Sequence, residues 1–462
     1  MEAVSNFLLP IVQKINMYLS DYILIFLLVG IGLFYTIRTR FVQIRCFGEG
    51  MKKVFGNIKL RGGKSGSGLS SFQALATAIA AQVGTGNIVG ACGAILIGGP
   101  GAIFWMWIIA FFGMATIYAE AVLAQDSKVV LEDGSVLGGP VYYIKKAFKG
   151  TFGKALAGFF AVATILALGC MGAMVQSNSI AGAVSTATAD VVPGWVIGLV
   201  LATLCAIIFI GGIKRIASVA EKIVPLMAVI YLVVGFIILG INVTKLPATF
   251  GMIFKYAFMP QAILGGTLGM AIKAAISQGV KRGLFSNEAG MGSTPHAHAQ
   301  ANVEKPHDQG VVAMIGVFID TFVVLTMTAL VVISTLYVGG NGTPAISKAN
   351  LMQTAVGTVL GNMTLGNILV AVCLTFFAFT TIISWNFFGK QNVQYLFGKK
   401  ATVVYSVIAV IFVMLGSLLS NDLVWELTDM FNNLMVIPNV LALAVLSGIV
   451  VAAVKSKKKK DK

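Results

Sequence analysis

The chain has few charged residues: Asp, Glu, Lys and Arg together make up 11% of its 462 positions. A soluble domain carries roughly 25% of such residues. Hydrophobic residues make up 57% of the chain, and its mean hydropathy is +0.90. This composition excludes an ordinary soluble domain and predicts an all-α integral membrane protein that crosses the bilayer many times.

Cysteine and histidine are scarce as well. The three histidines, His296, His298 and His307, share one hydrophilic loop, and the sequence shows no further ligands that would make them a metal site. No nucleophile–base pair or metal cluster is apparent within the apolar segments, so nothing indicates an enzyme or a cofactor. We interpret the five cysteines, which have neither metal spacing nor a disulfide framework, as small packing residues: Cys46, Cys92, Cys170, Cys205 and Cys373.

Apolar windows of about 20 residues, the length that crosses about 30 Å of hydrocarbon, occur eleven times. The first lacks a basic n-region and a cleavage site, so we expect it to be a retained helix. The sequence therefore predicts about eleven transmembrane helices. The windows cover residues 18–37, 71–97, 101–124, 155–188, 194–211, 222–241, 259–281, 310–338, 365–389, 401–419 and 424–453.

Acidic residues are outnumbered, and the net charge is +16. Most Lys and Arg residues lie in alternate connecting segments and in the tail, on one predicted side of the bilayer. This bias predicts a cell-membrane protein with its N-terminus outside and its C-terminus in the cytoplasm. The positive charge is thus a topology signal, and we expect no nucleic-acid partner.

The ten spans after the first divide into two groups of five with opposed direction. We expect an extra N-terminal helix and an amphipathic cytoplasmic linker over residues 1–70, with an interfacial helix near 41–58. The two inverted repeats would cover 71–245 and 246–454, and a basic cytoplasmic tail would cover 455–462.

Each group of five opens with a helix interrupted by glycines, at Val83-Gly84-Thr85-Gly86 and at residues 265–269. Lipid cannot satisfy free backbone groups, so a broken helix at membrane depth must line a cavity or be buried in protein. Paired breaks in two inverted halves predict a transporter site near the membrane midplane. The alternative is that these glycines serve close helix packing.

Three stretches of the chain resemble those of the sodium:alanine (alanine or glycine:cation) symporters. The segment from Gly98 to Gly113, GGPGAIFWMWIIAFFG, is similar to the signature of that family, and residues 83–87 and 285–292 resemble two further family stretches. The resemblance implies a LeuT-type fold with a five-plus-five inverted repeat. It also implies a small neutral amino acid, alanine or glycine, as substrate and sodium as the coupling ion.

A zwitterionic substrate needs donors for its carboxylate and acceptors for its ammonium. The break would free the N–H groups of Thr85 and Gly86 for the carboxylate, at the positive end of a half-helix that starts near Asn87. We therefore assign Thr85, Gly86 and Asn87 to the substrate site. We expect Gln176 and the backbone carbonyls of the second break to accept hydrogen bonds from the ammonium. The residues of that break are Gly266, Thr267 and Gly269, and we expect Trp385 to cap the pocket from the inner side. Gln176 could equally bond a neighbouring helix, and Trp385 could serve ordinary aromatic packing.

The resemblance also implies a sodium site. In the LeuT-type pattern, carbonyls beside the first break meet a carbonyl that precedes a pair of hydroxyls by three residues. Carried over to this chain, the ligands are the carbonyls of Ala80, Val83 and Phe377 and the hydroxyls of Thr380 and Thr381. The alternative for the two hydroxyls is a bond to a carbonyl of their own helix.

We therefore expect sodium-coupled import of alanine or glycine by alternating access. The alternative is a proton-coupled transporter of the same fold, in which Lys273 or Glu120 would carry the charge. We expect Lys273 to pair with Asp320 or Glu120, because ionisable groups inside spans are costly. The alternative is that its ammonium lies where another transporter of this fold places a cation. Glu288 is interpreted as an inner gate or loop anchor. A channel would need a continuous polar pore with rings of charge, which the sequence does not indicate.

Overall fold

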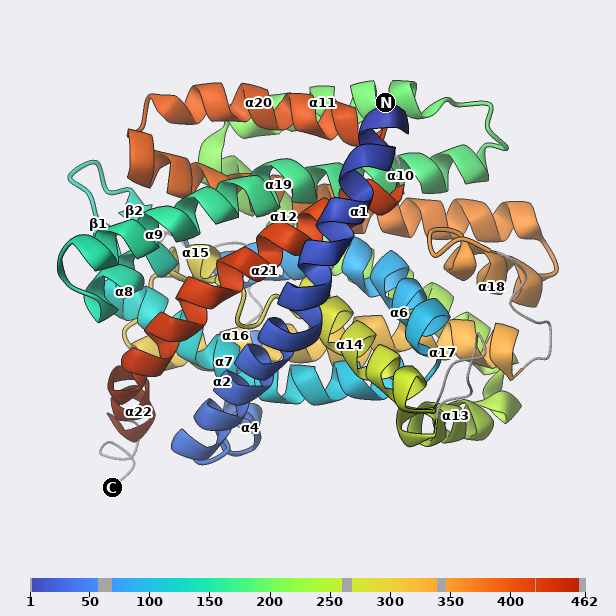
Figure 1. Ribbon diagram of the computed structural model, residues 1–462, viewed down its shortest axis with the longest axis horizontal. Coiled ribbons are helices and arrows are strands. Elements are labelled where there is room, and N and C mark those ends of the chain that lie inside the picture. Colours follow the sequence, from blue (N-terminus) through green and yellow to red (C-terminus); the bar gives the residue numbers. More distant parts are fainter. Residues whose placement is uncertain (1, 57–68, 260–267, 339–345, 420, 457–462) are drawn as a thin grey trace.

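The computed structural model describes residues 2–56, 69–259, 268–338, 346–419 and 421–456. This part of the chain is almost entirely helical (Figure 1), which confirms the predicted all-α class. A small antiparallel hairpin, β1 (Val129–Val130) with β2 (Val136–Leu137), is the exception. Gly266, Thr267 and most of the basic tail lie outside the described residues.

The helices of the first half are α1 (Glu2–Tyr18), η1 (Leu19–Leu24), α2 (Ile25–Arg38), α3 (Val42–Arg45), α4 (Phe47–Phe55), α5 (Ser71–Gln82), η2 (Gly86–Gly90), α6 (Ala91–Gly98), α7 (Ala102–Ser127), α8 (Pro140–Ala147), α9 (Gly150–Thr164), η3 (Ile165–Gly172), α10 (Ala173–Ala187), α11 (Gly194–Ile210), α12 (Gly212–Ile241) and η4 (Val243–Lys245).

The helices of the second half are α13 (Leu246–Phe258), α14 (Leu268–Asn287), α15 (Pro295–His298), α16 (Pro306–Val317), η5 (Phe318–Leu325), α17 (Thr326–Val332), η6 (Ile333–Tyr337), α18 (Leu351–Leu360), α19 (Met363–Phe397), α20 (Ala401–Gly416), α21 (Asn421–Val445) and α22 (Ser447–Ser456). Here η4 is a 3-10 turn, and the other η segments are π-helical turns within longer helices.

In the described part of the chain, seven helices are long and apolar enough to cross a membrane, and a bent pair would make an eighth. Three shorter apolar helices accompany them. The predicted eleven spans and the inverted repeat remain predictions. The predicted span at 259–281 lies partly outside the described residues, and α14 is described from Leu268 to Asn287. The interfacial helix expected near 41–58 corresponds to α3 and α4.

The bent pair consists of α5 and the helix formed by η2 and α6. A capping box starts α5, because the Ser70 hydroxyl accepts from the Gln73 N–H at 3.1 Å and the Gln73 side chain accepts from the Ser70 N–H at 3.2 Å. The helix ends at Gln82, since Val83 leaves the helical region with ψ of 86°. After the break, η2 and α6 resume at an angle of 45° to α5.

Long helices surround this bent pair. Contacts join α5 to α12 and α19, α6 to α14, α7 to α14 and α16, and α10 to α19. Figure 1 shows β1, β2, α8 and α22 at the left end of the molecule and α13, α17 and α18 at the right end. We call these the hairpin end and the α18 end.

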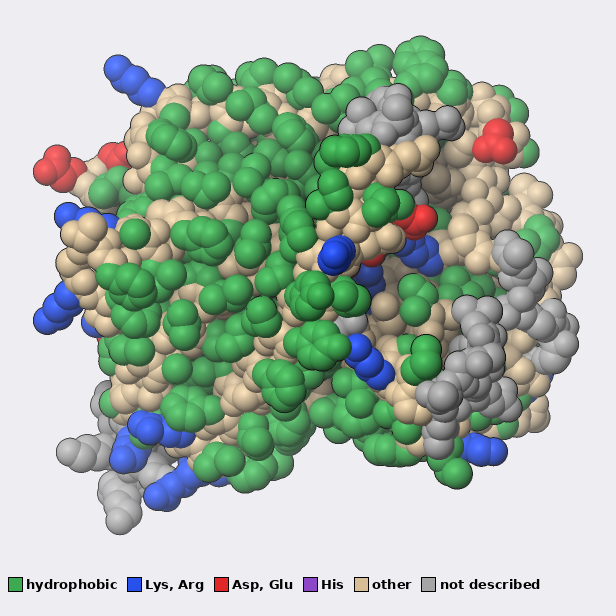
Figure 2. Space-filling view, in the orientation of Figure 1, with side chains coloured by type: hydrophobic (Ala, Val, Ile, Leu, Met, Phe, Trp, Pro, Cys, Tyr) green, Lys and Arg blue, Asp and Glu red, His purple; other side chains and the backbone are tan. Residues whose placement is uncertain are grey.

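The outer surface is apolar. Large hydrophobic side chains are strongly exposed on several helices, among them Phe26 at 76%, Ile210 at 86% and Phe236 at 64%. Figure 2 shows hydrophobic side chains over most of one face, with several Lys and Arg side chains toward the hairpin end. Such an extensive exposed apolar surface is unusual for a soluble monomer and suits contact with lipid.

Candidate functional site

The helix break predicted at Val83–Gly86 is present and completely buried. Two N–H groups freed at the break are bonded by side-chain oxygens. The Gly84 N–H donates to Asn87 Oδ1 at 3.0 Å, and the Thr85 N–H donates to Gln176 Oε1 at 3.1 Å. The break therefore presents donors that side chains, rather than the helix, satisfy in this structure.

Gln176 on α10 faces the break directly. Its Nε2 and the Thr85 hydroxyl are buried polar atoms with no hydrogen-bond partner among the described residues. Buried polar groups usually find partners, so such atoms need an explanation, and an absent ligand is one. A Cβ at Gly84 would overlap Thr381 Oγ1 and lie 3.1 Å from Gln176 Oε1. Glycine is therefore required for the close approach of α10 and α19 to the break.

Four of the five residues predicted to bind sodium lie together. The Thr381 hydroxyl is 2.9 Å from the Ala80 carbonyl and 3.1 Å from the Phe377 carbonyl. The Thr380 hydroxyl is 2.9 Å from the same Phe377 carbonyl. Val83, the fifth residue, is buried one turn after Ala80. The hydroxyls also bond within α19, as the alternative interpretation expected, but Thr381 additionally reaches across to α5.

A buried carboxylate beside the break escaped the sequence-based site prediction. Asp320 accepts from Asn87 Nδ2 at 2.7 Å, from the Thr321 hydroxyl at 2.8 Å and from the Ser286 hydroxyl at 3.0 Å. Its side chain is fully buried. The signal was available, because an acid inside an apolar span marks a functional site by default. Asn87, predicted to contact substrate, divides its side-chain amide between Gly84 and Asp320.

Most of the predicted second break, residues 265–269, lies outside the described residues. Gly269 is exposed in the first turn of α14, and a Cβ there would meet nothing within 4 Å. The assignment of Gly269 to the substrate stays a prediction. The described interruption follows α14, where Glu288, Gly290 and Gly292 have positive φ angles of 59°, 91° and 81°. A backbone with positive φ cannot continue a right-handed helix. Glycine permits this conformation but does not impose it.

This later interruption adjoins the first break. A Cβ at Gly86 would lie 3.0 Å from the Ser286 Cα and 3.1 Å from the Phe285 ring. The two non-helical segments are thus held together by the end of α14. Residues 285–292 resemble a stretch of the symporter family, whereas the predicted second break lies at residues 265–269.

Trp385 on α19 lies beside the later interruption. Its indole N–H donates to Glu288 Oε1 at 2.5 Å, and the Ser293 hydroxyl donates to the other carboxylate oxygen. The indole packs edge-on against Phe285 with 5.9 Å between ring centres, and a Cβ at Gly172 would overlap the indole ring. Glu288 therefore holds the turn to α19, in keeping with a loop anchor.

The segment around the later interruption is buried and anchored by polar contacts. Every residue from 282 to 301 is buried. Glu120 accepts from the N–H groups of Gly290 and Gly292 at 3.1 and 3.0 Å and from Asn439 Nδ2 at 2.6 Å. Gln125 donates to the Ala301 carbonyl at 2.9 Å. Carboxylates that accept from several N–H groups anchor a turn firmly.

The prediction that Lys273 pairs with Asp320 or Glu120 is wrong. The Lys273 ammonium donates to the Tyr22 hydroxyl at 3.2 Å and lies 4.7 Å from the centre of that ring. Both carboxylates are instead bonded by amides, hydroxyls and backbone N–H groups. A long lysine side chain reaches the surface of the helix bundle more cheaply than it enters the core.

Cavities lie at both ends of the molecule. One of about 880 Å³ at the hairpin end is lined in part by Val136 and Gln391. Another of about 730 Å³ at the α18 end is lined in part by Asn178, Lys348 and Asp422. Beside it, Arg282 and Asp429 form two charge-assisted hydrogen bonds of 2.9 and 3.2 Å. The Arg282 guanidinium lies 4.7 Å from the centre of a Trp425 ring.

Comparison with known proteins identifies the family. A family profile described as the sodium:alanine symporter family matches residues 5–462. The chain belongs to this family. The symporter is similar to the sodium/alanine symporter AgcS of Methanococcus maripaludis, with 40% identity over 96% of both chains. It is also 39% identical to the probable sodium/glutamine symporter GlnT of Bacillus subtilis, over 96% of this chain and 90% of that protein.

Solved structures show the same fold. The symporter matches the crystal structure of MhsT in complex with L-phenylalanine, with a TM-score of 0.59 and 14% identity over 84% of this chain and 98% of that one. It also matches a Na⁺-coupled sialic acid symporter, with a TM-score of 0.51 and 11% identity over 86% and 81%. These structures show the fold, and the family and relatives show the role: a multi-pass membrane transporter of amino acids and cations, not an enzyme.

Proposed function

We propose that this symporter couples the inward movement of sodium to the import of alanine or glycine by alternating access. The observation that carries the proposal is the meeting of Thr381 with the first break. One hydroxyl on α19 lies within 3.1 Å of the carbonyls of Ala80 and Phe377, which belong to two different helices. Hard cations prefer such clusters of oxygen ligands.

The assignment of the coupling ion follows from these oxygens. A sodium ion bound by Ala80, Val83, Phe377, Thr380 and Thr381 would join α5 to α19. A cation and the Thr381 hydroxyl proton would compete for the same carbonyls. Ion binding would therefore turn the O–H bond of Thr381 away from Ala80, while the hydroxyl oxygen stays as a ligand. Sodium would thereby fix the relative position of the two helices on either side of the substrate.

The substrate would occupy the space beside Thr85 and Gln176. Its carboxylate would take the N–H groups of Thr85 and Gly86, and its ammonium would be accepted by oxygens from Gln176 and nearby carbonyls. The unpartnered atoms Gln176 Nε2 and Thr85 Oγ1 support a polar ligand here. Gly84, Gly86 and Gly172 bring neighbouring helices close, which favours a small side chain over a large one.

A proton-coupled transporter of the same fold is the second candidate, and Asp320 is the observation that favours it. This carboxylate is fully buried and belongs to a chain of hydrogen bonds that begins at the break. Lys273 and Glu120, the carriers first considered, fit less well because their contacts lie away from the break. A relative from Bacillus subtilis bears the name putative sodium/proton-dependent alanine carrier protein YrbD.

The orientation and the repeats are part of the proposal. We place the hairpin end and the C-terminus in the cytoplasm and the N-terminus outside. The repeats would comprise residues 71–245 and 246–454. Lys and Arg residues on the hairpin side support this orientation under the positive-inside rule.

Uptake of labelled alanine into proteoliposomes tests the function. We expect uptake to require an inward sodium gradient and to be inhibited strongly by unlabelled glycine and weakly by glutamine. An inward proton gradient without sodium should drive no uptake. Concentrative alanine uptake under a proton gradient alone would reject sodium coupling in favour of the Asp320 alternative. Strong inhibition by glutamine would reject the small-substrate assignment.

A further inference from the structure

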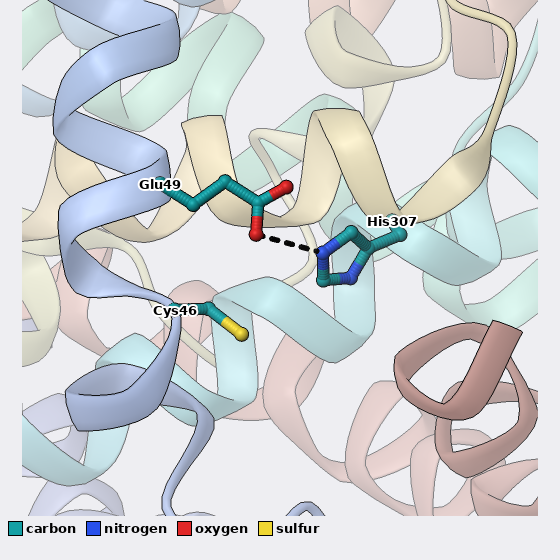
Figure 3. A group of neighbouring side chains, drawn as sticks. All are labelled: Cys46, Glu49 and His307. Atoms are coloured by element: carbon teal, nitrogen blue, oxygen red, sulfur yellow. Dashed lines mark hydrogen bonds and ion pairs between the residues drawn. The ribbon is translucent and has the colours of Figure 1, made fainter. Parts of the chain in front are cut away.

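A cluster of three potential metal ligands lies outside the transport site. Cys46 lies between α3 and α4, Glu49 lies on α4, and His307 lies in the first turn of α16. The sulfur, one carboxylate oxygen and one ring nitrogen all lie within 4.8 Å of one another. Figure 3 shows these side chains directed toward a common space. Cys46 and His307 are buried, and Glu49 is partly exposed.

The spacing fits a small tetrahedral ion. His307 Nε2 and Glu49 Oε2 are 3.4 Å apart. Two ligands of a tetrahedral zinc ion, with bonds of about 2.0–2.2 Å to nitrogen and oxygen, lie roughly 3.3–3.5 Å apart. The thiolate bond is about 2.3 Å, so small rotations of the Cys46 and Glu49 side chains would complete the geometry.

The outer surroundings of His307 suit a ligand. Its Nδ1 is 2.7 Å from the Tyr118 hydroxyl on α7, and its Nε2 faces Glu49. Metal-binding histidines usually bond a second group through the other ring nitrogen, which fixes the tautomer and the ring orientation. With Nδ1–H donating to the Tyr118 oxygen, the Nε2 lone pair is directed at the space between Cys46 and Glu49.

The cluster lies where α4 already packs on α16. Lys53 pairs with Asp308 at 3.1 Å, and the rings of Phe47 and Phe318 lie 4.9 Å apart. A Cβ at Gly50 would lie 2.7 Å from the Val311 carbonyl, so the two helices are in close contact. The ligands therefore belong to rigid, packed elements, which is what a precise metal site requires.

We propose that Cys46, Glu49 and His307 form a binding site for a divalent transition metal, Zn²⁺ by its ligand set. The three protein ligands leave a fourth position for water, on the side from which Glu49 is accessible. Bound metal clamps the amphipathic segment 42–55 to α16, whose continuation η5 carries Asp320. The inference does not rest on the proposed coupling ion or substrate.

Cobalt substitution of the full-length protein in detergent tests the site. We expect metal-depleted protein to bind about one Co²⁺ per chain, with the thiolate-to-cobalt charge-transfer band that identifies a cysteine ligand. One equivalent of Zn²⁺ should abolish the band, and a large excess of Mg²⁺ should not. Replacing Cys46→Ser should remove the band, and His307→Gln should weaken Co²⁺ binding at least tenfold.

Cys205→Ser is the matched control, because Cys205 is equally buried but lies on α11 in another hydrophobic cluster. It should keep the band. A wild-type protein that shows no charge-transfer band at millimolar Co²⁺ would overturn the proposal, as would a band that persists in Cys46→Ser. Because the wild-type result is decisive by itself, the test does not depend on the folding of any variant.

Discussion

Replacing Thr381→Ala should raise the sodium concentration that gives half-maximal alanine uptake. The substitution removes one of the five predicted ligand oxygens and leaves the helix otherwise able to form. Interactions with a charged partner contribute about 1.5–3 kcal/mol, and each 1.4 kcal/mol corresponds to a factor of ten. We therefore expect an increase of roughly 10- to 150-fold. Maximal uptake at saturating sodium should change far less, because the hydroxyl is not assigned to the substrate.

The measurement is initial uptake of labelled alanine into proteoliposomes at a series of sodium concentrations and at constant ionic strength. Thr381→Ser keeps the hydroxyl and should stay within a few-fold of the wild type. Thr375→Ala is the matched control, since that hydroxyl on the same helix bonds only the Ala371 carbonyl in the described contacts, at 2.7 Å. An unchanged half-maximal sodium concentration in Thr381→Ala would remove this hydroxyl from the ligand set.

Two further substitutions test the packing around the site. Gly84→Ala should abolish uptake because the new Cβ would overlap Thr381 Oγ1, whereas Gly90→Ala, whose Cβ would meet nothing closer than 3.8 Å, should retain it; equal uptake by the two variants would contradict the close approach. Asp429→Ala should lower the free energy of unfolding of the detergent-solubilised protein by about 3–5 kcal/mol, because it leaves the buried Arg282 charge uncompensated. Asp133→Ala, which breaks the exposed pair with Lys399, should leave the melting temperature nearly unchanged because solvent screens that pair, and similar losses of stability in both variants would refute this reasoning.

The first break could be predicted because its signal is local. Gly84 and Gly86 interrupt an apolar span, and lipid permits such an interruption only inside protein. The distance between that break and Thr381 could not be derived from spacing, since the residues lie on different helices 300 positions apart. Only the family resemblance connected them. The predicted contacts with Gln176 illustrate the same limit, because its two alternatives differ in packing rather than in sequence.

The interruption that follows α14 was not predicted from the sequence, for a physical reason. Glycine density was taken as the signal, and residues 265–269 are the denser run. In the described structure, the helix after Leu268 is regular, and it is the sequence of positive φ angles at 288, 290 and 292 that ends it. A non-glycine residue begins that series, and its left-handed conformation is held by contacts to Trp385 and Ser293. Those contacts are tertiary and leave no local signature.

The hydrogen bond from the Thr85 N–H to Gln176 has a consequence for affinity. In this structure, Gln176 Oε1 accepts from the Thr85 N–H, which is the donor assigned to the substrate carboxylate. The glutamine oxygen and the substrate would therefore compete for the same hydrogen bond. Binding would exchange one hydrogen bond for another, and a typical net gain is only about 0.5–1.5 kcal/mol. A carrier that must release its cargo on every cycle benefits from this weak balance. The same glutamine would bond the Thr85 N–H when no substrate is bound. The substrate-free transporter could then change its conformation without leaving that buried donor unpaired.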